Sequence, residues 1–383
     1  MQIVVDKDIF FAEKYFASLG DVIKVDGRSI TAALVKQADI LIVRSITNVT
    51  ESLLRGSAVR FVGSVTSGTD HIDQACLQKN GIGFGCAAGS NARAVAEYVL
   101  SSLMVLMEQR EFDLISKTVA IIGCGHTGSL LRGFLHSLGV RCLVNDPPLR
   151  DATGGQDYCE LNEVFDADII SVHVPLVKTG AYPTWRMIDA AFLQRLREDV
   201  ILINTSRGDV IDENALLPFL DLYQQASVVL DVWNGEPDID SELMQKATIA
   251  TAHIAGHTLD AKLKAVAMVY KQACSYFQQP CAATSMDNFR NLEPVEIALT
   301  AEVAELDAIQ MAVLTSYDVR TDASALRQIL SLEPGQRARF FDDLRSQYRT
   351  RREFSALRIK LPAECQRLAG KLNHLGFPTS LQP

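Results

Sequence analysis

Short runs of apolar residues alternate with amphipathic stretches through residues 1–280. The stretch IFFAEKYFASLG has helical spacing and ends at Gly20, which predicts a helix with a glycine cap. It lies among apolar runs of strand length, namely QIVV, VIKV, DILIV and FVGSV. This alternation is typical of βαβ units built around a parallel sheet, so the pattern predicts an α/β fold.

A second series of apolar runs lies between residues 118 and 253. Its members are TVAIIG, RCLVND, DIISVHV, VILINT, SVVLDV and TIATAH. They are almost continuous in Val, Ile and Leu, as expected for strands that are covered on both faces. Six such strands are enough for a complete doubly wound sheet, so we expect a dinucleotide-binding domain here.

The segments after residue 253 follow a different pattern. A long helical stretch ends near SYFQQP, and we expect it to return to the opening segment, which makes the dinucleotide domain an insertion. In the last hundred residues, IQMAVLTSYDV and FSALRIKL are predicted strands, whereas ASALRQIL and ECQRLAGKLNHLG are predicted helices. We interpret this segment as a small α+β domain for interaction or oligomerisation, and its basic residues as a solvated helix face.

Composition and charge exclude several classes of function. The net charge of −9 and the pI of about 5.4 do not favour a nucleic-acid or membrane surface as partner. The stretch VAEYVLSSLMVLM is too short to cross a bilayer and is predicted to be a buried helix. None of the 8 cysteines forms a C-x-x-C pair or a zinc-like cluster, so we expect a reduced cytoplasmic protein without a structural metal.

A glycine motif follows the first strand of the second series. Gly123, Gly125 and Gly128 form G-x-G-x-x-G before a helical stretch, with His126 and Thr127 inside the motif. Such a turn lets the backbone and the helix N-terminus approach a pyrophosphate. Asp146 ends the next strand, where an acidic side chain binds the ribose hydroxyls and favours NAD over NADP. A simple glycine turn with a helix-capping aspartate is the alternative interpretation.

Three later segments each follow a strand of the same series, INTSRGDVID, VLDVWNGEPD and TAHIAG. The carboxyl ends of parallel strands line one crevice, so Arg207, Glu236 and His253 are expected to converge. Oxidation of a 2-hydroxy acid needs a proton acceptor, for which a histidine held by a carboxylate is suited. The arginine is suited to hold a substrate carboxylate.

The segments GCGHTG, SVTSGTDHID, NTSRGDVID, LDVWNGEP and HIAGHT resemble the D-isomer-specific 2-hydroxyacid dehydrogenase family. The resemblance covers about residues 1–280 and implies a Rossmann NAD domain inserted in a split, flavodoxin-like substrate domain. The implied boundaries are 1–93 with 257–285 for the substrate domain, 94–256 for the NAD domain, and 286–383 for a C-terminal dimerisation domain.

The resemblance also implies roles for individual residues. It supports Arg207, Glu236 and His253 as the catalytic set. It implies further cofactor contacts at Val174, where the family often has a hydroxyl residue, and at Ser206, Arg207, Gly208, Asp231 and Gly256. It implies substrate contacts at Ser45, at Thr66 and at His257, where Tyr is common, with Arg44 as a nearby cation for a phosphate.

A narrower resemblance rests on VRSIT, NDPP, HIAGHTLDAK and the C-terminal extension. It implies a homodimer that oxidises 4-phospho-D-erythronate at C2 on the route to pyridoxal phosphate. A phosphoglycerate dehydrogenase or a generic D-2-hydroxyacid dehydrogenase remains open, as does a non-enzymatic NAD-sensing binding protein. Arg351 and Arg352 either reach a site across the dimer or lie on a solvated basic helix, and the second interpretation is favoured.

Overall fold

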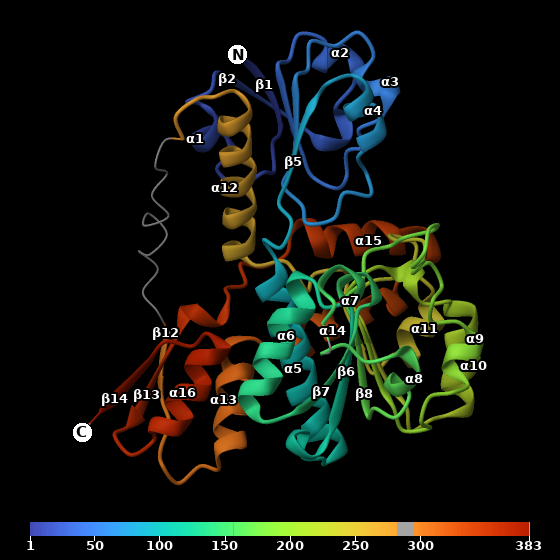
Figure 1. Ribbon diagram of the computed structural model, residues 1–383, viewed down its shortest axis with the longest axis vertical. Helices are drawn as coiled ribbons and strands as arrows, with labels where there is room; N and C mark the ends of the chain where they lie inside the picture. Colours follow the sequence, from blue (N-terminus) through green and yellow to red (C-terminus); the bar gives the residue numbers. More distant parts are fainter. Residues whose placement is uncertain (156, 282–294, 383) are drawn as a thin grey trace. The chain divides into compact units, whose positions relative to one another are not determined.

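The computed structural model describes residues 1–155, 157–281 and 295–382, which form two compact units (Figure 1). The first unit contains residues 1–91 and the described chain from residue 258 to residue 281. The second unit contains the described residues from 92 to 257 and residues 295–382. Each unit has its own parallel sheet and its own hydrophobic core.

The first unit is built on a five-stranded parallel sheet with the order β2-β1-β3-β4-β5. The four strands expected from apolar runs are all present. The fifth strand has the sequence GFGC. It was not predicted, because its two glycines interrupt the run of apolar residues that is typical of a strand. The strands are β1 (Gln2–Asp6), β2 (Asp21–Val25), β3 (Ile40–Val43), β4 (Phe61–Ser64) and β5 (Gly83–Cys86). This order places a topological switch point between β1 and β3, where ligands bind in open α/β sheets.

Helix α12 (Leu259–Tyr276) supplies most of the cover for one face of this sheet. Its apolar residues, among them Val266, Val269 and Tyr270, are buried together with Ile3 and Phe61 of the sheet. The other helices of the unit are α1 (Ala12–Phe16), α2 (Ala32–Val35), α3 (Glu51–Leu54) and α4 (Gln74–Lys79). Helix α1 ends before Gly20, so the predicted glycine cap is wrong; Gly20 instead packs against the backbone of Met1.

The second unit is built on a six-stranded parallel sheet with the order β11-β10-β9-β8-β6-β7. All six predicted strands are present, as expected for the Rossmann domain. They are β6 (Thr118–Ile122), β7 (Arg141–Asn145), β8 (Ile169–Val172), β9 (Ile201–Asn204), β10 (Ser227–Leu230) and β11 (Ile249–Ala250). The helices are α5 (Ala92–Arg110), α6 (His126–Leu138), α7 (Pro147–Thr153), α8 (Leu161–Val164), α9 (Ala190–Leu193), α10 (Glu213–Leu222) and α11 (Ser241–Lys246).

Helix α5 lies in the centre of the second unit. Its residues from Val95 to Met107 are all buried, as predicted for a core helix. In the described part of the chain, no helix combines the length and the apolar character that crossing a membrane requires.

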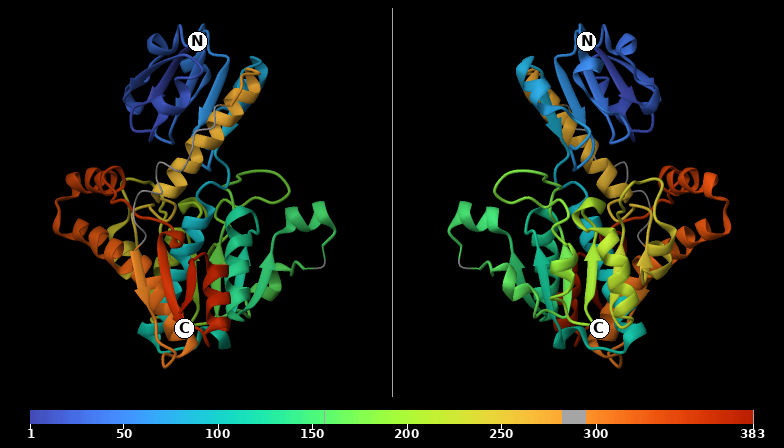
Figure 2. Two further views of the ribbon diagram at one scale, coloured as in Figure 1. Left: turned by 90° about the vertical axis from the view of Figure 1, so that its left-hand side faces the viewer. Right: turned by 90° about the vertical axis from the view of Figure 1, so that its right-hand side faces the viewer.

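The C-terminal segment packs on α5 and belongs to the second unit. Its helices are α13 (Glu305–Ser316), α14 (Val319–Arg327), α15 (Pro334–Ser346) and α16 (Gln366–Leu375). Its strands β12 (Val295–Ala298), β13 (Leu357–Pro362) and β14 (Thr379–Gln382) form a parallel sheet, with α16 packed against β14 (Figure 2, left). The strand predicted at 309–319 is wrong: Ile309, Ala312 and Val313 lie on one face of α13, which packs on α5.

Short 3₁₀ helices complete the described structure. They are η1 (Gly27–Ser29), η2 (Leu114–Ser116), η3 (Gly208–Val210), η5 (Gln328–Ser331) and η6 (Phe354–Ala356).

Candidate active site

The glycine motif forms the turn between β6 and α6. Gly123 has φ of 89°, and a Cβ atom there would lie 2.5 Å from the carbonyl oxygen of His173. A Cβ at Gly128 would lie 2.0 Å from the carbonyl oxygen of Gly123, so only glycine allows this contact. A Cβ at Gly125 would meet nothing within 4 Å. The turn therefore leaves open space at the N-terminus of α6, which begins with His126 and Thr127, and it fits a pyrophosphate.

Asp146 connects the end of β7 to this turn. Its Oδ2 accepts a hydrogen bond from the amide of Cys124 at 2.7 Å, and its Oδ1 accepts one from Leu149 at 3.0 Å and caps α7. The helix-capping role is therefore present, and it fixes the carboxylate beside the glycine turn. The Val174 side chain also borders the turn, because its Cγ1 would be 2.9 Å from a Cβ at Gly123.

Arg207 follows β9 and precedes η3 (Gly208–Val210). Its Nη1 donates to the carbonyl of Ser206 at 2.7 Å, and the Ser206 hydroxyl donates to Oδ1 of Asn204 at 2.8 Å. A Cβ at Gly208 would lie 2.1 Å from the carbonyl of Trp233. This close backbone approach brings the Arg207 segment against the loop that carries Glu236.

Glu236 and His253 form a direct pair, although they follow different strands. Oε2 of Glu236 lies 2.7 Å from Nδ1 of His253, and Oε1 accepts a hydrogen bond from the amide of Trp233 at 2.9 Å. Burial acts to raise the pKa of Glu236, but the attraction of His253 and the charge of Arg345 outweigh it and lower the pKa. The pair is thus an ionised carboxylate holding an imidazole whose side chain remains 33% exposed.

Asp231 holds the turn that carries His253. Its carboxylate accepts hydrogen bonds from the Thr251 hydroxyl at 2.6 Å and from the amides of Ile254 and Ala255 at 2.8 and 2.9 Å. His253 itself has φ of 55°, a strained conformation for a residue with a side chain. The expected cofactor contact of Asp231 stays a prediction, since the carboxylate is 1% exposed and shapes this turn.

The rest of the turn leads into α12. Gly256 follows Ala255, and the amide of His257 donates to the carbonyl of Ile254 at 2.8 Å. The His257 ring packs edge-on against Tyr348 of the C-terminal segment, with 5.9 Å between the ring centroids. A substrate contact of His257 stays a prediction.

The substrate residues expected in the first unit lie at the carboxyl ends of its strands. Ser45 is in an exposed turn after β3, and the Thr66 hydroxyl donates to the carbonyl of Gly68 at 2.8 Å. Arg44 pairs with Asp6 at 2.8 Å and with Asp8 at 2.7 Å, so this cation already has two carboxylate partners.

Sequence reasoning missed Lys262, in the first turn of α12. Burial, and to a smaller extent the nearby Arg44 guanidinium, lowers the pKa of Lys262. Among the described residues, no carboxylate forms an ion pair with it. Lys262 ends the segment HIAGHTLDAK, which carries the narrower resemblance, so a signal was present. The sequence did not show that this lysine is half-buried, because burial depends on the surrounding fold.

Arg351 is buried in the second unit and does not lie on a helix. Residues 349–353 are not helical, and Arg351 is 2% exposed, so the solvated basic helix predicted for it is wrong. Its guanidinium donates to two backbone carbonyls, which no sequence pattern reveals.

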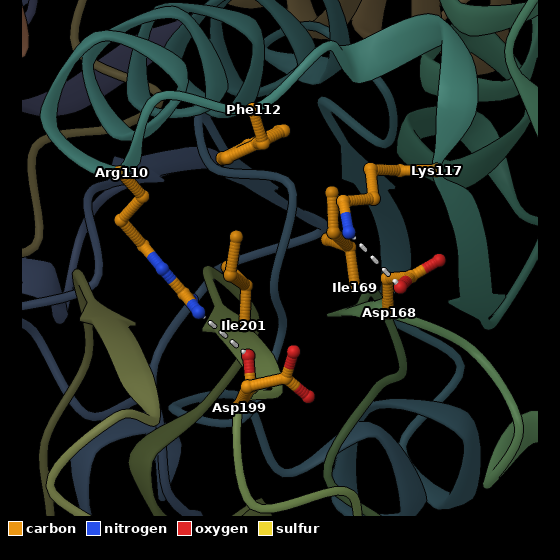
Figure 3. Close-up of a pocket in the computed structure, with 7 residues that line it drawn as sticks. All are labelled: Arg110, Phe112, Lys117, Asp168, Ile169, Asp199 and Ile201. Atoms are coloured by element: carbon orange, nitrogen blue, oxygen red, sulfur yellow. Dashed lines mark hydrogen bonds and ion pairs between the residues drawn. The ribbon is translucent and has the colours of Figure 1, made fainter.

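A cavity of about 190 Å³ lies elsewhere in the second unit (Figure 3). It is lined by residues at the amino ends of β6, β8 and β9, the opposite edge of the sheet from His253. Its charges are engaged: Lys117 contacts Asp168 at 3.3 Å, and Arg110 donates to the carbonyl of Asp199 at 3.0 Å. The cavity is therefore distinct from the candidate active site.

Comparisons with known proteins show the family to which the chain belongs. Residues 95–255 match the NAD binding domain of the D-isomer specific 2-hydroxyacid dehydrogenases, and residues 291–376 match a domain of unknown function, DUF3410. A protein of Hahella chejuensis named erythronate-4-phosphate dehydrogenase is 42% identical over 381 residues, covering 99% of this chain and 100% of that protein. One of the same name from Cronobacter sakazakii is 41% identical over 389 residues, covering 100% of both chains.

Solved structures share the fold. An NAD⁺-bound 3-phosphoglycerate dehydrogenase of Entamoeba histolytica has a TM-score of 0.62 at 24% identity, covering 73% of this chain and 95% of that one. A D-lactate dehydrogenase of Aquifex aeolicus in complex with NAD and lactic acid has a TM-score of 0.58 at 22% identity, covering 73% and 96%.

Proposed function

The chain belongs to the erythronate-4-phosphate dehydrogenases, within the D-isomer specific 2-hydroxyacid dehydrogenase family, and on that premise we propose that it uses NAD to oxidise 4-phospho-D-erythronate at C2. The product is the 2-oxo acid, 3-hydroxy-2-oxo-4-phosphooxybutanoate, a precursor on the route to pyridoxal 5′-phosphate. The observation that carries this proposal is the 2.7 Å pair of Glu236 and His253 at the strand ends of an NAD-binding sheet.

In this mechanism His253 takes the proton of the C2 hydroxyl through Nε2, because Glu236 holds Nδ1. The ionised carboxylate then stabilises the imidazolium that forms. Arg207, placed by the backbone contact of Gly208 with Trp233, binds the substrate carboxylate and polarises the C2 oxygen. NAD, when bound at the Gly123–Gly128 turn and Asp146, supplies the acceptor for the hydride that leaves C2.

We also propose the expected cofactor contacts at His126, Thr127, Val174, Ser206, Gly208, Asp231 and Gly256. The structure supports some of these contacts better than others. Val174 and Gly208 border the glycine turn and the catalytic loops, whereas the Asp231 carboxylate is occupied by its own turn.

For the substrate phosphate we propose Lys262, together with Ser45 and Thr66. Lys262 is a half-buried cation close to a second cation, Arg44, and it has no carboxylate partner among the described residues. Arg44 lies at the end of β3 and pairs with Asp6 at the end of β1, which is the switch point of the first sheet. An anion bound there would relieve the repulsion between the two cations. Arg44 is the weaker candidate, since its charge is balanced.

The decisive experiment is a substrate panel under identical conditions. 4-Phospho-D-erythronate, 3-phosphoglycerate, D-lactate and unphosphorylated D-erythronate are compared by kcat/KM with NAD. We expect the highest value for 4-phospho-D-erythronate. A preference for 3-phosphoglycerate or D-lactate would instead favour the other enzymes of the family, and NAD binding without turnover of any acid would favour a sensor protein.

We further propose a homodimer formed through residues 286–383, in the cytoplasm. Large apolar side chains on the C-terminal segment are exposed, namely Val295, Met311 and Leu381, and these are the side chains that we propose for the contact with a second chain. Cys76, Cys124 and Cys274 are buried, where cysteine serves as a small hydrophobic side chain, which supports a reducing compartment. Light scattering of the purified protein measures its molar mass and so tests the homodimer. A monomer at micromolar concentration would contradict the homodimer.

A further inference from the structure

The C-terminal segment reaches the catalytic turn through one buried arginine. Nη1 of Arg351 donates to the carbonyl of Ala255 at 3.1 Å, and Nη2 donates to the carbonyl of Ala94 in α5 at 2.8 Å. The guanidinium carbon lies 3.6 Å from the centre of the Tyr317 ring, a cation–π contact. Arg351 is 2% exposed, so these contacts replace water at Nη1 and Nη2, whereas its buried Nε has no hydrogen-bond partner among the described residues.

Ala255 is two residues from His253, in the turn that Asp231 holds from the other side. Asp231 binds the amides of Ile254 and Ala255, whereas Arg351 binds the carbonyl of Ala255. The same C-terminal stretch contacts His257 through Tyr348. The strained backbone of His253 is thus followed by a residue, Ala255, whose amide is held by Asp231 and whose carbonyl is held by Arg351.

We propose that Arg351 is a positioning residue for His253, so that residues 295–382 help to complete the catalytic site of their own chain. This rests on the proposed function, because it assigns a role to the C-terminal segment in that reaction. A buried guanidinium is costly to desolvate, and apolar residues of similar size fill such space at a lower cost. A role in fixing the Ala255 carbonyl relative to α5 would explain why an arginine is buried at position 351.

The chain offers a matched control for this idea. Arg327 of α14 also comes from the C-terminal segment, and it also donates to two backbone carbonyls, those of Ala247 and Thr248 at 3.1 and 3.0 Å. These carbonyls precede β11, whereas Ala255 follows it. The two arginines therefore make the same kind of contact at opposite ends of one strand, and only Arg351 is next to the catalytic turn.

The experiment compares Arg351→Met, Arg351→Lys and Arg327→Met in the full-length protein. We measure kcat, the KM for NAD, the thermal midpoint, and amide hydrogen exchange of the peptides that cover residues 253–257. For Arg351→Met we expect kcat to fall by about 10- to 100-fold, because small misplacements of a catalytic group have effects of this size. The KM for NAD is expected to stay within about threefold.

The control is expected to lose thermal stability, because Arg327 also gives up two carbonyl contacts, but to keep kcat within about twofold of wild type and unchanged exchange at 253–257. Arg351→Lys keeps the charge but cannot hold both carbonyls at once, so it is expected to recover part of kcat and of the protection from exchange. If Arg351→Met fails to fold, Arg351→Lys and Arg327→Met are compared alone, with kcat lowered only in the first.

Equal kcat in Arg351→Met and Arg327→Met would overturn the proposal, and so would unchanged exchange at 253–257 in both Arg351 variants. Failure of the proposed function is a separate result. If the wild-type protein turns over none of the acids, the exchange measurement still decides whether Arg351 fixes this turn.

Discussion

Nδ1 of His253 lies 2.7 Å from Oε2 of Glu236, while the other carboxylate oxygen is fixed by the amide of Trp233. The imidazole therefore has a defined tautomer, with Nε2 left for the substrate proton. We expect His253→Ala to lower kcat by at least about 100-fold, the usual size of general-base catalysis, with NAD affinity changed only a few-fold. Turnover is measured by NADH absorbance, and activity equal to wild type would remove His253 as the base.

A methyl group added at Gly125 or at Gly133 would have no protein atom within 4 Å. Gly125 borders the open space of the glycine turn, but Gly133 is exposed on α6. We expect Gly125→Ala to weaken NAD binding by at least about tenfold without loss of thermal stability, because the methyl group occupies space that the pyrophosphate needs. Titration of NADH fluorescence measures this. Gly133→Ala should bind NAD as the wild type does.

Asp146 is held beside the glycine turn by the amides of Cys124 and Leu149. Its negative charge repels a 2′-phosphate, so Asp146→Ala should lower the ratio of kcat/KM with NAD to kcat/KM with NADP by about tenfold or more. Asp146→Asn removes the charge but keeps one acceptor oxygen, so it can hold only one of the two amides, which the two carboxylate oxygens accept separately. Comparing the thermal midpoints of the two variants separates the electrostatic effect from the structural one. If neither variant changes the cofactor ratio, Asp146 does not select the cofactor.

Lys262 is the candidate cation for the phosphate. Lys262→Met should raise the KM for 4-phospho-D-erythronate by about tenfold, since one charge-assisted contact is worth roughly 1.5–3 kcal/mol. The KM for NAD should not change. Lys264→Met, an exposed lysine on the same helix, serves as the control. The assignment is wrong if both variants raise the substrate KM equally or if neither does.

Glu213 on α10 accepts a hydrogen bond from the amide of Asn234, next to the Glu236 loop. Burial is the largest cause that raises the pKa of Glu213 to about 7. The folded state then binds a proton more tightly than the unfolded chain, so this group lowers the free energy of unfolding as pH rises from about 4.5 to about 7. We expect Glu213→Gln to remove a decline on the order of 2 kcal/mol over this range.

Urea denaturation followed by tryptophan fluorescence suits this test, because both tryptophans, Trp185 and Trp233, lie in the second unit. A variant whose unfolding free energy has the same slope with pH as the wild type would show that Glu213 is ionised in the folded protein at neutral pH.

Much of the fold was predictable because parallel strands covered on both faces must be apolar along their whole length. The six strands of the second unit have this property, and β5 with its two glycines does not. The run around Ile309 was predicted as a strand and forms α13, since a short apolar run fits either element until its packing on α5 is known.

The candidate site was predictable where strand topology alone brings residues together. Glu236 and His253 are 17 residues apart in sequence, and both follow strands of one parallel sheet. Arg351 was not predictable in this way, because its partners Ala255 and Ala94 are 96 and 257 residues away and offer only backbone carbonyls. The residue type at position 351 shows only that a positive charge is present. The burial of the Arg351 side chain depends on its packing against the ring of Tyr317, which is not visible in the sequence.

Helices α13 and α14 of the C-terminal segment pack on α5, the buried helix of the NAD-binding unit. A ribosome finishes the chain through His253 well before it adds these helices and Arg351. A nascent or prematurely terminated chain therefore carries Arg207, Glu236 and His253 but exposes one apolar side of α5, a surface that chaperones and proteases recognise. Nonsense mutations late in the gene are thus expected to remove the protein from the cell, and not to leave a working catalytic half.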